Sequence, residues 1–169
     1  MSVHTISAPT CKITPTPPPE THIEIKSSPL ALVVAGANIA VSITAVPDHS
    51  EAFAYRLPTI QTVGHIDTGA TLTSIDISLA KTLGLGQTGY ILTQTAGGPQ
   101  RMPTYVIDLT FPLVGLQPLY SIKIGSCQLG YKINEKPSVK NFGILIGRDV
   151  MSRWHITWNG PTSTVTICD

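Results

Sequence analysis

Short runs of alternating apolar and polar residues, separated by turn-forming residues, occupy most of the chain after residue 28. In the run 105–111 (YVIDLTF) every second residue is large and apolar, which gives the segment one apolar face. Near the C-terminus, the runs 156–158 and 164–167 flank Asn159-Gly160-Pro161, which predicts a hairpin. Because a period of two is typical of half-buried strands, the pattern predicts a mainly β chain, folded as a sandwich or a partly closed barrel.

Two short helices interrupt this pattern. Ser74 or Asp76 can cap a first helix whose apolar side carries Ile77, Ala80 and Leu83, and Gly84 can end it. Asp149 can cap a second helix over 150–154.

The N-terminal segment differs in composition from the rest. Residues 1–28 contain five prolines among Ser and Thr, which predicts a Pro-rich tail or linker ahead of one domain over 29–169. The apolar stretch 30–46 is too short and too polar for a membrane helix, which needs about 20 apolar residues. Its second half alternates, so we expect two strands here, joined by a turn at Gly36-Ala37-Asn38.

Charge and cysteine content narrow the classes of partner. The formal net charge is +1, and no Lys/Arg run is present, which argues against nucleic acid as a partner. The three cysteines lie far apart, at 11, 127 and 168, in neither a disulfide nor a metal-binding pattern. We therefore expect a cytoplasmic protein without a metal, acting on a polypeptide or a small molecule.

The segment 65–70 (HIDTGA) carries the strongest chemical signal. An apolar strand, 63–66, runs directly into Asp67, Thr68 and Gly69. Two carboxyl groups that share one proton can activate a water molecule and protonate a leaving amine, because two charges that close cannot both ionise. The glycine lets the backbone approach such a site closely, and the Thr hydroxyl can lock the turn by hydrogen bonding.

A second motif lies about 80 residues downstream, where 144–146 (ILI) leads into Gly147-Arg148-Asp149. Together the two motifs resemble the retropepsin family of aspartic proteases, including its bacterial and other cellular relatives. The resemblance implies that Asp67, Thr68 and Gly69 form the catalytic triplet and that Gly147 and Arg148 are structural residues beneath it. It further implies the fold of a retropepsin-like acid-protease half-barrel.

The resemblance also implies a flap and a substrate cleft. Segments 90–95 and 101–111 can pair as a hairpin, with Gly97 and Gly98 near its tip. In the family such a hairpin forms backbone hydrogen bonds with an extended peptide substrate, which binds as an added strand. The other residues expected to contact substrate are Ala70, Thr71, Leu72 and Leu145. Leu72 makes the edge of this cleft apolar, so we expect a preference for apolar side chains.

The number of D-T-G motifs determines the expected assembly. Asp67 is the only one of six aspartates in such a motif, so one chain supplies half a dyad. A second identical chain must complete it across a two-fold axis, with the C-terminal hairpin as part of the interface. The expected product is a homodimeric aspartic endopeptidase that needs no cofactor. Two alternatives stay open, namely a catalytically idle dimeric peptide-binding module and a protease domain released from a polyprotein.

Thr71 and His65 lie close to the D-T-G motif. Many retroviral members place an acid directly after the D-T-G-A stretch, as the partner of the Gly-Arg arginine, whereas this chain has Thr71 there. Asp149 is therefore a candidate partner for Arg148. His65 precedes the motif by two residues, and the alternation of strand side chains favours a structural role for it.

Overall fold

The structure is a computed structural model that describes residues 3–6, 31–46, 57–95 and 97–169. Most of the expected tail, 1–28, lies outside these residues. The described elements in chain order are β1 (Val3–Ile6), α1 (Ala31–Ala35), β2 (Ala37–Ala45), β3 (Thr59–Ile66), β4 (Ser74–Asp76), α2 (Ile77–Thr82), β5 (Gly89–Thr95), β6 (Gly98–Thr110), β7 (Leu119–Cys127), β8 (Ile144–Ile146), α3 (Arg148–Met151), β9 (His155–Asn159) and β10 (Thr164–Cys168).

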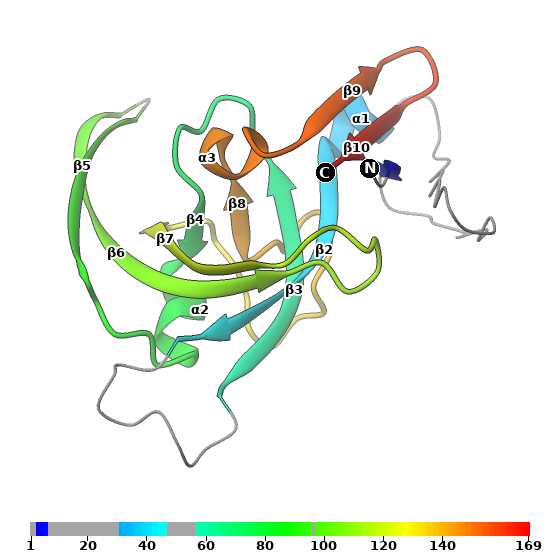
Figure 1. Ribbon diagram of the computed structural model, residues 1–169. Coiled ribbons are helices and arrows are strands. Elements are labelled where there is room, and N and C mark those ends of the chain that lie inside the picture. Colours follow the sequence, from blue (N-terminus) through cyan, green and yellow to red (C-terminus); the bar gives the residue numbers. More distant parts are fainter. Residues whose placement is uncertain (1–2, 7–30, 47–56, 96) are drawn as a thin grey trace.

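The larger sheet closes on itself as a barrel. Its strand order is β2-β3-β8-β4-β7-β6-β5, and β2 also pairs with β6, so six strands form a closed ring within the described chain. β5 stays outside the ring and pairs with β6 alone, so the β5–β6 hairpin extends away from the barrel (Figure 1). This arrangement confirms the predicted mainly β fold, and the closed six-strand barrel is consistent with the expected retropepsin-like fold.

The interior of the barrel is filled by β-branched and other aliphatic side chains, as the alternating runs predicted. The largest fully buried side chains from its strands are Val41, Ile43, Ile75, Ile107, Leu109, Ile124, Ile144 and Ile146. Fully burying such a side chain contributes about 1.5–3 kcal/mol, so this core is the main stabilising term of the domain.

The predicted C-terminal hairpin is present and belongs to a second sheet. β10 pairs with β9 and, on its other edge, with β1, which the sequence reading did not anticipate. Val165 and Ile167 on β10 are fully buried, and Trp154 packs edge-on against Phe111 with ring centroids 5.3 Å apart. These contacts join the small sheet to the barrel core.

The helices correct two details of the prediction. The segment 31–35 forms α1 and not a strand, and Gly36 at φ +63° ends the helix before β2 begins. α2 begins at the predicted cap, because the Asp76 side chain accepts a hydrogen bond from the Ser78 amide. Ile77, expected on the apolar side of this helix, is 38% exposed. α3 starts two residues earlier than predicted, at Arg148, with Gly147 as its N-cap. No helix of the described residues has the length and apolar content that crossing a membrane requires.

The connection between β3 and β4 crosses over the end of β8. β8 lies between these two strands and runs parallel to β3, so Asp67 and Gly147 follow their strands at the same edge of the sheet. A Cβ at Gly147 would lie 2.6 Å from the carbonyl carbon of Leu72 and 2.7 Å from the amide nitrogen of Thr73. Only a residue without a side chain fits beneath this crossing.

This close approach predicts the effect of Gly147→Ala. The added methyl group meets backbone and not a flexible side chain, so the loop must move, which costs about 1–3 kcal/mol of unfolding free energy. Urea unfolding at a fixed protein concentration measures the loss. Gly86→Ala is the matched control, because a Cβ there has nothing within 4 Å. Equal stability of the two variants would contradict the crossing.

Candidate active site

The loop that carries Asp67 is held to the end of β8 by backbone hydrogen bonds. The Asp67 amide donates to the carbonyl of Ile146 at 3.0 Å, and the Arg148 amide donates to the carbonyl of Ala70 at 2.9 Å. The two sequence motifs, far apart along the chain, therefore form one structural unit at the edge of the barrel.

The Asp67 side chain folds into the turn that follows it. Its Oδ1 accepts a hydrogen bond from the Gly69 amide at 2.8 Å, and its carbonyl accepts one from Ala70 at 3.1 Å. Such a turn, closed by an Asp side chain, fixes the direction of the carboxylate. Oδ2 accepts no hydrogen bond from the described residues, while Thr68 and Gly69 are exposed. Asp67 itself is half-buried, and its Oδ2 is free of such bonds beside an exposed turn.

Arg148 supports this loop through two hydrogen bonds and has no acidic partner among the residues that the structure describes. Its guanidinium donates to the carbonyl of Thr68 and to the Thr71 hydroxyl, both at 2.9 Å. At position 71, where the resemblance stated above would place an acid in many family members, the Thr71 hydroxyl accepts this guanidinium instead. The expected pairing of Arg148 with Asp149 is not formed.

Asp149 instead fixes the inner part of the loop, a role that the sequence reading missed. Its Oδ1 accepts hydrogen bonds from the amide of Thr73 at 2.9 Å, from the Thr73 hydroxyl at 2.8 Å, and from the Val150 amide at 2.9 Å. The Thr73 hydroxyl, in turn, accepts the Gly147 amide at 3.0 Å. Thr73 is fully buried, so these bonds satisfy its polar atoms in an apolar setting.

His65 is a structural residue, as the strand alternation indicated. Its Nδ1 lies 3.0 Å from Oδ1 of Asn38, and its ring stacks on Phe142 with centroids 5.1 Å apart. The Asn38 amide donates to the carbonyls of Ala35 and Gly36, so its oxygen is the acceptor for His65. A Cβ at Gly36 would lie 2.5 Å from the His65 ring, which explains the glycine.

The hairpin predicted as a flap forms, although β6 begins at Gly98, three residues earlier than predicted. Thr95 is paired with Gly98, so Gly97 lies at the tip, and Ala96 is outside the described residues. At the base, the amide and hydroxyl of Thr88 both donate to the carbonyl of Thr104, a fully buried residue that pairs with Gly125 of β7. β6 is therefore fixed in the barrel at one end and free of barrel pairing at the other.

Leu72 and Met102 meet between the hairpin and the Asp67 loop. The Leu72 Cδ2 and Met102 Sδ atoms both lie 3.1 Å from the position that a Cβ at Gly125 would occupy. Leu145, also predicted to contact substrate, is half-buried in β8, where it pairs with His65 and Ser74. Its contact with substrate stays a prediction.

The described residues offer no obvious metal site. Within the described ranges, no three His, Cys, Asp or Glu side chains gather closely enough to hold a metal ion.

Burial of His65 predicts a dependence of stability on pH. Burial lowers the pKa of His65 below its ordinary value of 6.5, and the negative charge of Asp67 opposes this shift. The unfolded chain therefore binds a proton more readily than the folded chain, so the stabilisation is complete above about pH 6.5 and is lost as the pH falls through the lower folded value. Urea unfolding of the wild type between pH 7.5 and 5 should show this loss.

The variant His65→Gln should remove most of that component, whereas His155→Gln, at an exposed position of β9, should retain it. An unchanged pH profile in His65→Gln would contradict this explanation.

Comparison with known proteins agrees with this geometry. Residues 60–129 match the family model described as "Aspartyl protease", a range that includes the Asp67 loop and the β5–β6 hairpin. None of the curated proteins matches the chain. Among solved structures, a retropepsin-like aspartic protease from Rickettsia conorii matches with 16% identity and a TM-score of 0.44, covering 78% of this chain and 80% of that one. The family model therefore agrees with the aspartic protease resemblance that the two motifs predicted.

Proposed function

We propose that this chain is an aspartic endopeptidase whose active form is a homodimer, with Asp67 of each copy contributing one carboxyl group to a shared dyad. The observation that carries the proposal is the Asp67 carboxylate, which one hydrogen bond from Gly69 orients on an exposed, rigidly supported turn. A turn of this kind suits a group that must meet its partner at a fixed distance.

The need for a second copy follows from chemistry and from exposure. Hydrolysis by two carboxyls requires one protonated and one ionised group, and this chain has a single D-T-G motif. Thr68, Gly69 and Thr71 are exposed around Asp67, which leaves room for the same loop of another copy. A two-fold axis through this surface would bring the two loops together.

The proposed reaction needs only the dyad, water and the peptide. The ionised carboxylate removes a proton from the attacking water, while the protonated carboxyl donates its proton to the carbonyl oxygen of the scissile bond. The carboxyl that took the water proton then passes it to the amine nitrogen, while the other carboxylate recovers a proton from a hydroxyl of the tetrahedral intermediate. The C–N bond breaks, and the dyad again holds one proton. Thr68 and Gly69 hold the dyad in place, Arg148 supports their loop, and no cofactor takes part.

The β5–β6 hairpin would cover the substrate. Its base is anchored through Thr104, and its tip at Gly97 and Gly98 extends beyond the barrel (Figure 1). An extended peptide lying beneath it can hydrogen-bond to strand backbone, which recognises peptides with little regard to sequence. Ala70 and Thr71 would contact the same peptide from the opposite side.

Selectivity would come from the side chains that line this space. Ile91 pairs with Met102, so both project from the face of the hairpin that meets Leu72. All three are apolar, and the neighbouring Leu92 projects from the opposite face because strand residues alternate. The proposed substrates therefore carry apolar side chains near the cleaved bond.

We also propose that the protein works in a reducing, cytoplasmic setting. The free thiols of Cys127 and Cys168 support this part of the proposal.

Replacing the catalytic carboxyl tests the reaction. Asp67→Asn should lower kcat/KM on a peptide library by at least about 100-fold, because general acid–base catalysis is lost. Mass spectrometry of the digests measures the cleavage, and the exposed Glu135→Gln serves as control.

Specific activity of the wild type should also rise with protein concentration until dimerisation is complete. Binding of peptides by both proteins without hydrolysis by either would favour the idle binding module.

Replacing Leu72 tests the proposed preference for apolar substrates. Leu72→Ser should lower kcat/KM for the preferred apolar peptides by about 10-fold, since the side chain of the substrate loses apolar contact in the transition state. Leu92→Ser is the matched control, because Leu92 lies on the outer face of the β5–β6 hairpin and is 74% exposed. A library profile dominated by charged residues beside the cleaved bond would refute the apolar assignment.

A further inference from the structure

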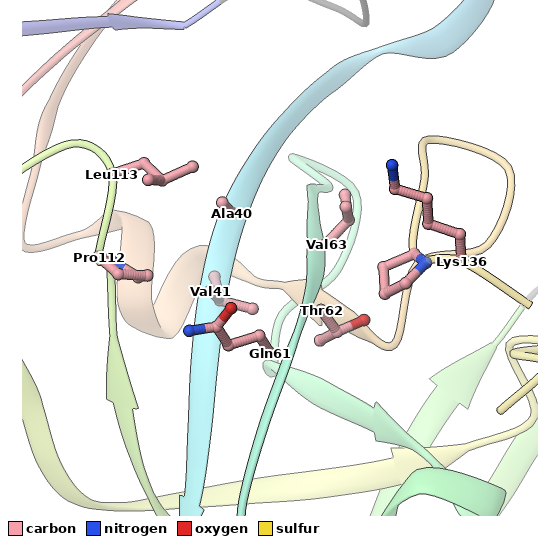
Figure 2. A pocket seen from close by; sticks show the side chains of 9 residues that line it. Ala40, Val41, Gln61, Thr62, Val63, Pro112, Leu113 and Lys136 are labelled. Carbon is pink, nitrogen blue, oxygen red and sulfur yellow. The ribbon is translucent and has the colours of Figure 1, made fainter.

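A groove lies on the outer surface of the β2–β3 ladder, apart from the Asp67 loop. It has a volume of about 370 Å³, and two connecting segments form its walls, 112–113 on one side and 136–137 on the other (Figure 2). The residues that line it are Ala40, Val41, Gln61, Thr62, Val63, Pro112, Leu113, Lys136 and Pro137. None of the residues 67–73 lines this groove. Val63 precedes Asp67 by four strand positions, or about 13 Å.

The floor of the groove is largely apolar. Ala40 pairs with Val63 in the ladder, and both project from the outer face, because their neighbours Val41 and Thr62 are buried on the core side. Leu113 on the rim is 59% exposed, although it is a large apolar side chain. A ligand that fills this groove would remove these apolar surfaces from water, which favours an apolar body.

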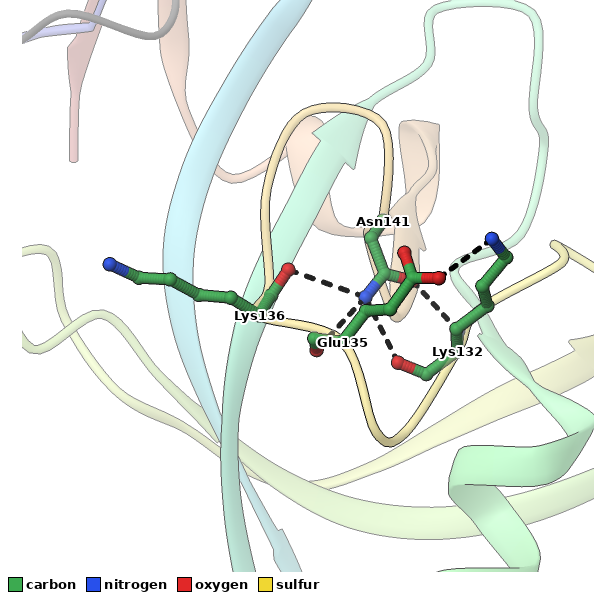
Figure 3. Close-up of polar contacts among 4 residues, drawn as sticks. All are labelled: Lys132, Glu135, Lys136 and Asn141. Carbon is green, nitrogen blue, oxygen red and sulfur yellow. Dashed lines mark hydrogen bonds and ion pairs between the residues drawn. The ribbon is translucent and has the colours of Figure 1, made fainter.

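The opposite wall carries a cation on a rigid support. The Asn141 side chain is buried and donates to the carbonyls of Lys132, Glu135 and Lys136, while its oxygen accepts the Lys132 amide at 2.7 Å (Figure 3). The Asn141 side chain thus holds the turn 132–136 through hydrogen bonds to its backbone. Because the backbone of Lys136 is fixed in this way, its ammonium group projects from a defined point on the rim.

Lys136 differs from Lys132 in its ion pairing and not in its charge. Lys132 forms an ion pair with Glu135 at 2.7 Å, whereas Lys136 has no acidic partner among the described residues. An unpaired ammonium beside an apolar floor complements a molecule with one negative group at the end of an apolar body. The size of the groove lies at the small end of the range for small-molecule sites, about 300–1,000 Å³.

We propose that this groove binds a small amphipathic carboxylate, with its apolar body over Ala40 and Val63 and its carboxylate on Lys136. Gln61 also lines the groove and is exposed, so its amide adds a polar group to the floor. A single cation is too few for nucleic acid, which needs several phosphate contacts. The proposal does not depend on the protease assignment.

Titration of the full-length chain with decanoate, followed by amide NMR shifts, tests this site. The Asp67→Asn background keeps any proteolysis from altering the sample. Saturable shifts should gather at Ala40, Val63, Leu113 and Lys136, and decan-1-ol should bind more weakly. Lys136→Gln should raise the Kd for decanoate about three- to five-fold, as expected for an exposed ion pair, while the control Lys132→Gln should leave it unchanged.

Three results would overturn the proposal. These are shifts that gather elsewhere on the chain, equal effects of Lys136→Gln and Lys132→Gln, and equal affinity for decanoate and decan-1-ol. A further arm uses a hexapeptide with a single Glu among apolar residues. Binding of that peptide in the groove while decanoate leaves it unshifted would also overturn the small-molecule proposal, in favour of a polypeptide.

Discussion

The passage of the Asp67 loop across the end of β8 is the constraint on which the rest of the site depends. Two parallel strands, β3 and β8, end at the same edge of the barrel, and the loop from β3 must pass over β8 to reach β4. Gly147 makes this passage possible, because its missing side chain leaves room for the peptide between Leu72 and Thr73. The hydrogen bonds from Asp67 to Ile146 and from Arg148 to the loop form at this crossing.

The supports divide the loop into an outer and an inner half. Arg148 holds the outer half through Thr68 and Thr71, and Asp149 holds the inner half through Thr73. Adjacent residues of opposite charge thus act on different segments and form no ion pair with each other. Arg148 therefore needs no acid at position 71, since the Thr71 hydroxyl accepts its guanidinium.

The features that could be predicted from the sequence depend on local chemistry. Asp76 caps α2 through the amide two residues later, and the terminal hairpin turns at Asn159, so both signals lie within a few residues. The D-T-G and Gly-Arg motifs were recognisable because each is compact, whereas the structure shows that they follow neighbouring strands. The hairpin over 89–110 followed from alternation and from the glycines at its tip.

The features that could not be predicted depend on contacts between distant segments. The Thr73–Asp149 pair spans 76 residues, and the Asn38–His65 pair spans 27, so neither leaves a local pattern. The segment 31–35 is apolar throughout and fits a strand or a helix equally well. The pairing of β1 with β10 likewise joins the two ends of the chain. In each case the partner, and not the residue itself, determines the role.

The central claim is that two copies of Asp67 form one site, and the stoichiometry of a tight active-site ligand tests it most directly. Isothermal titration with a statine-type inhibitor, at protein concentrations above the dimer dissociation constant, should give one inhibitor for every two chains. Asp67→Asn should abolish that binding while remaining folded. A stoichiometry of one inhibitor per chain, or equal binding by a protein that stays monomeric, would contradict the account.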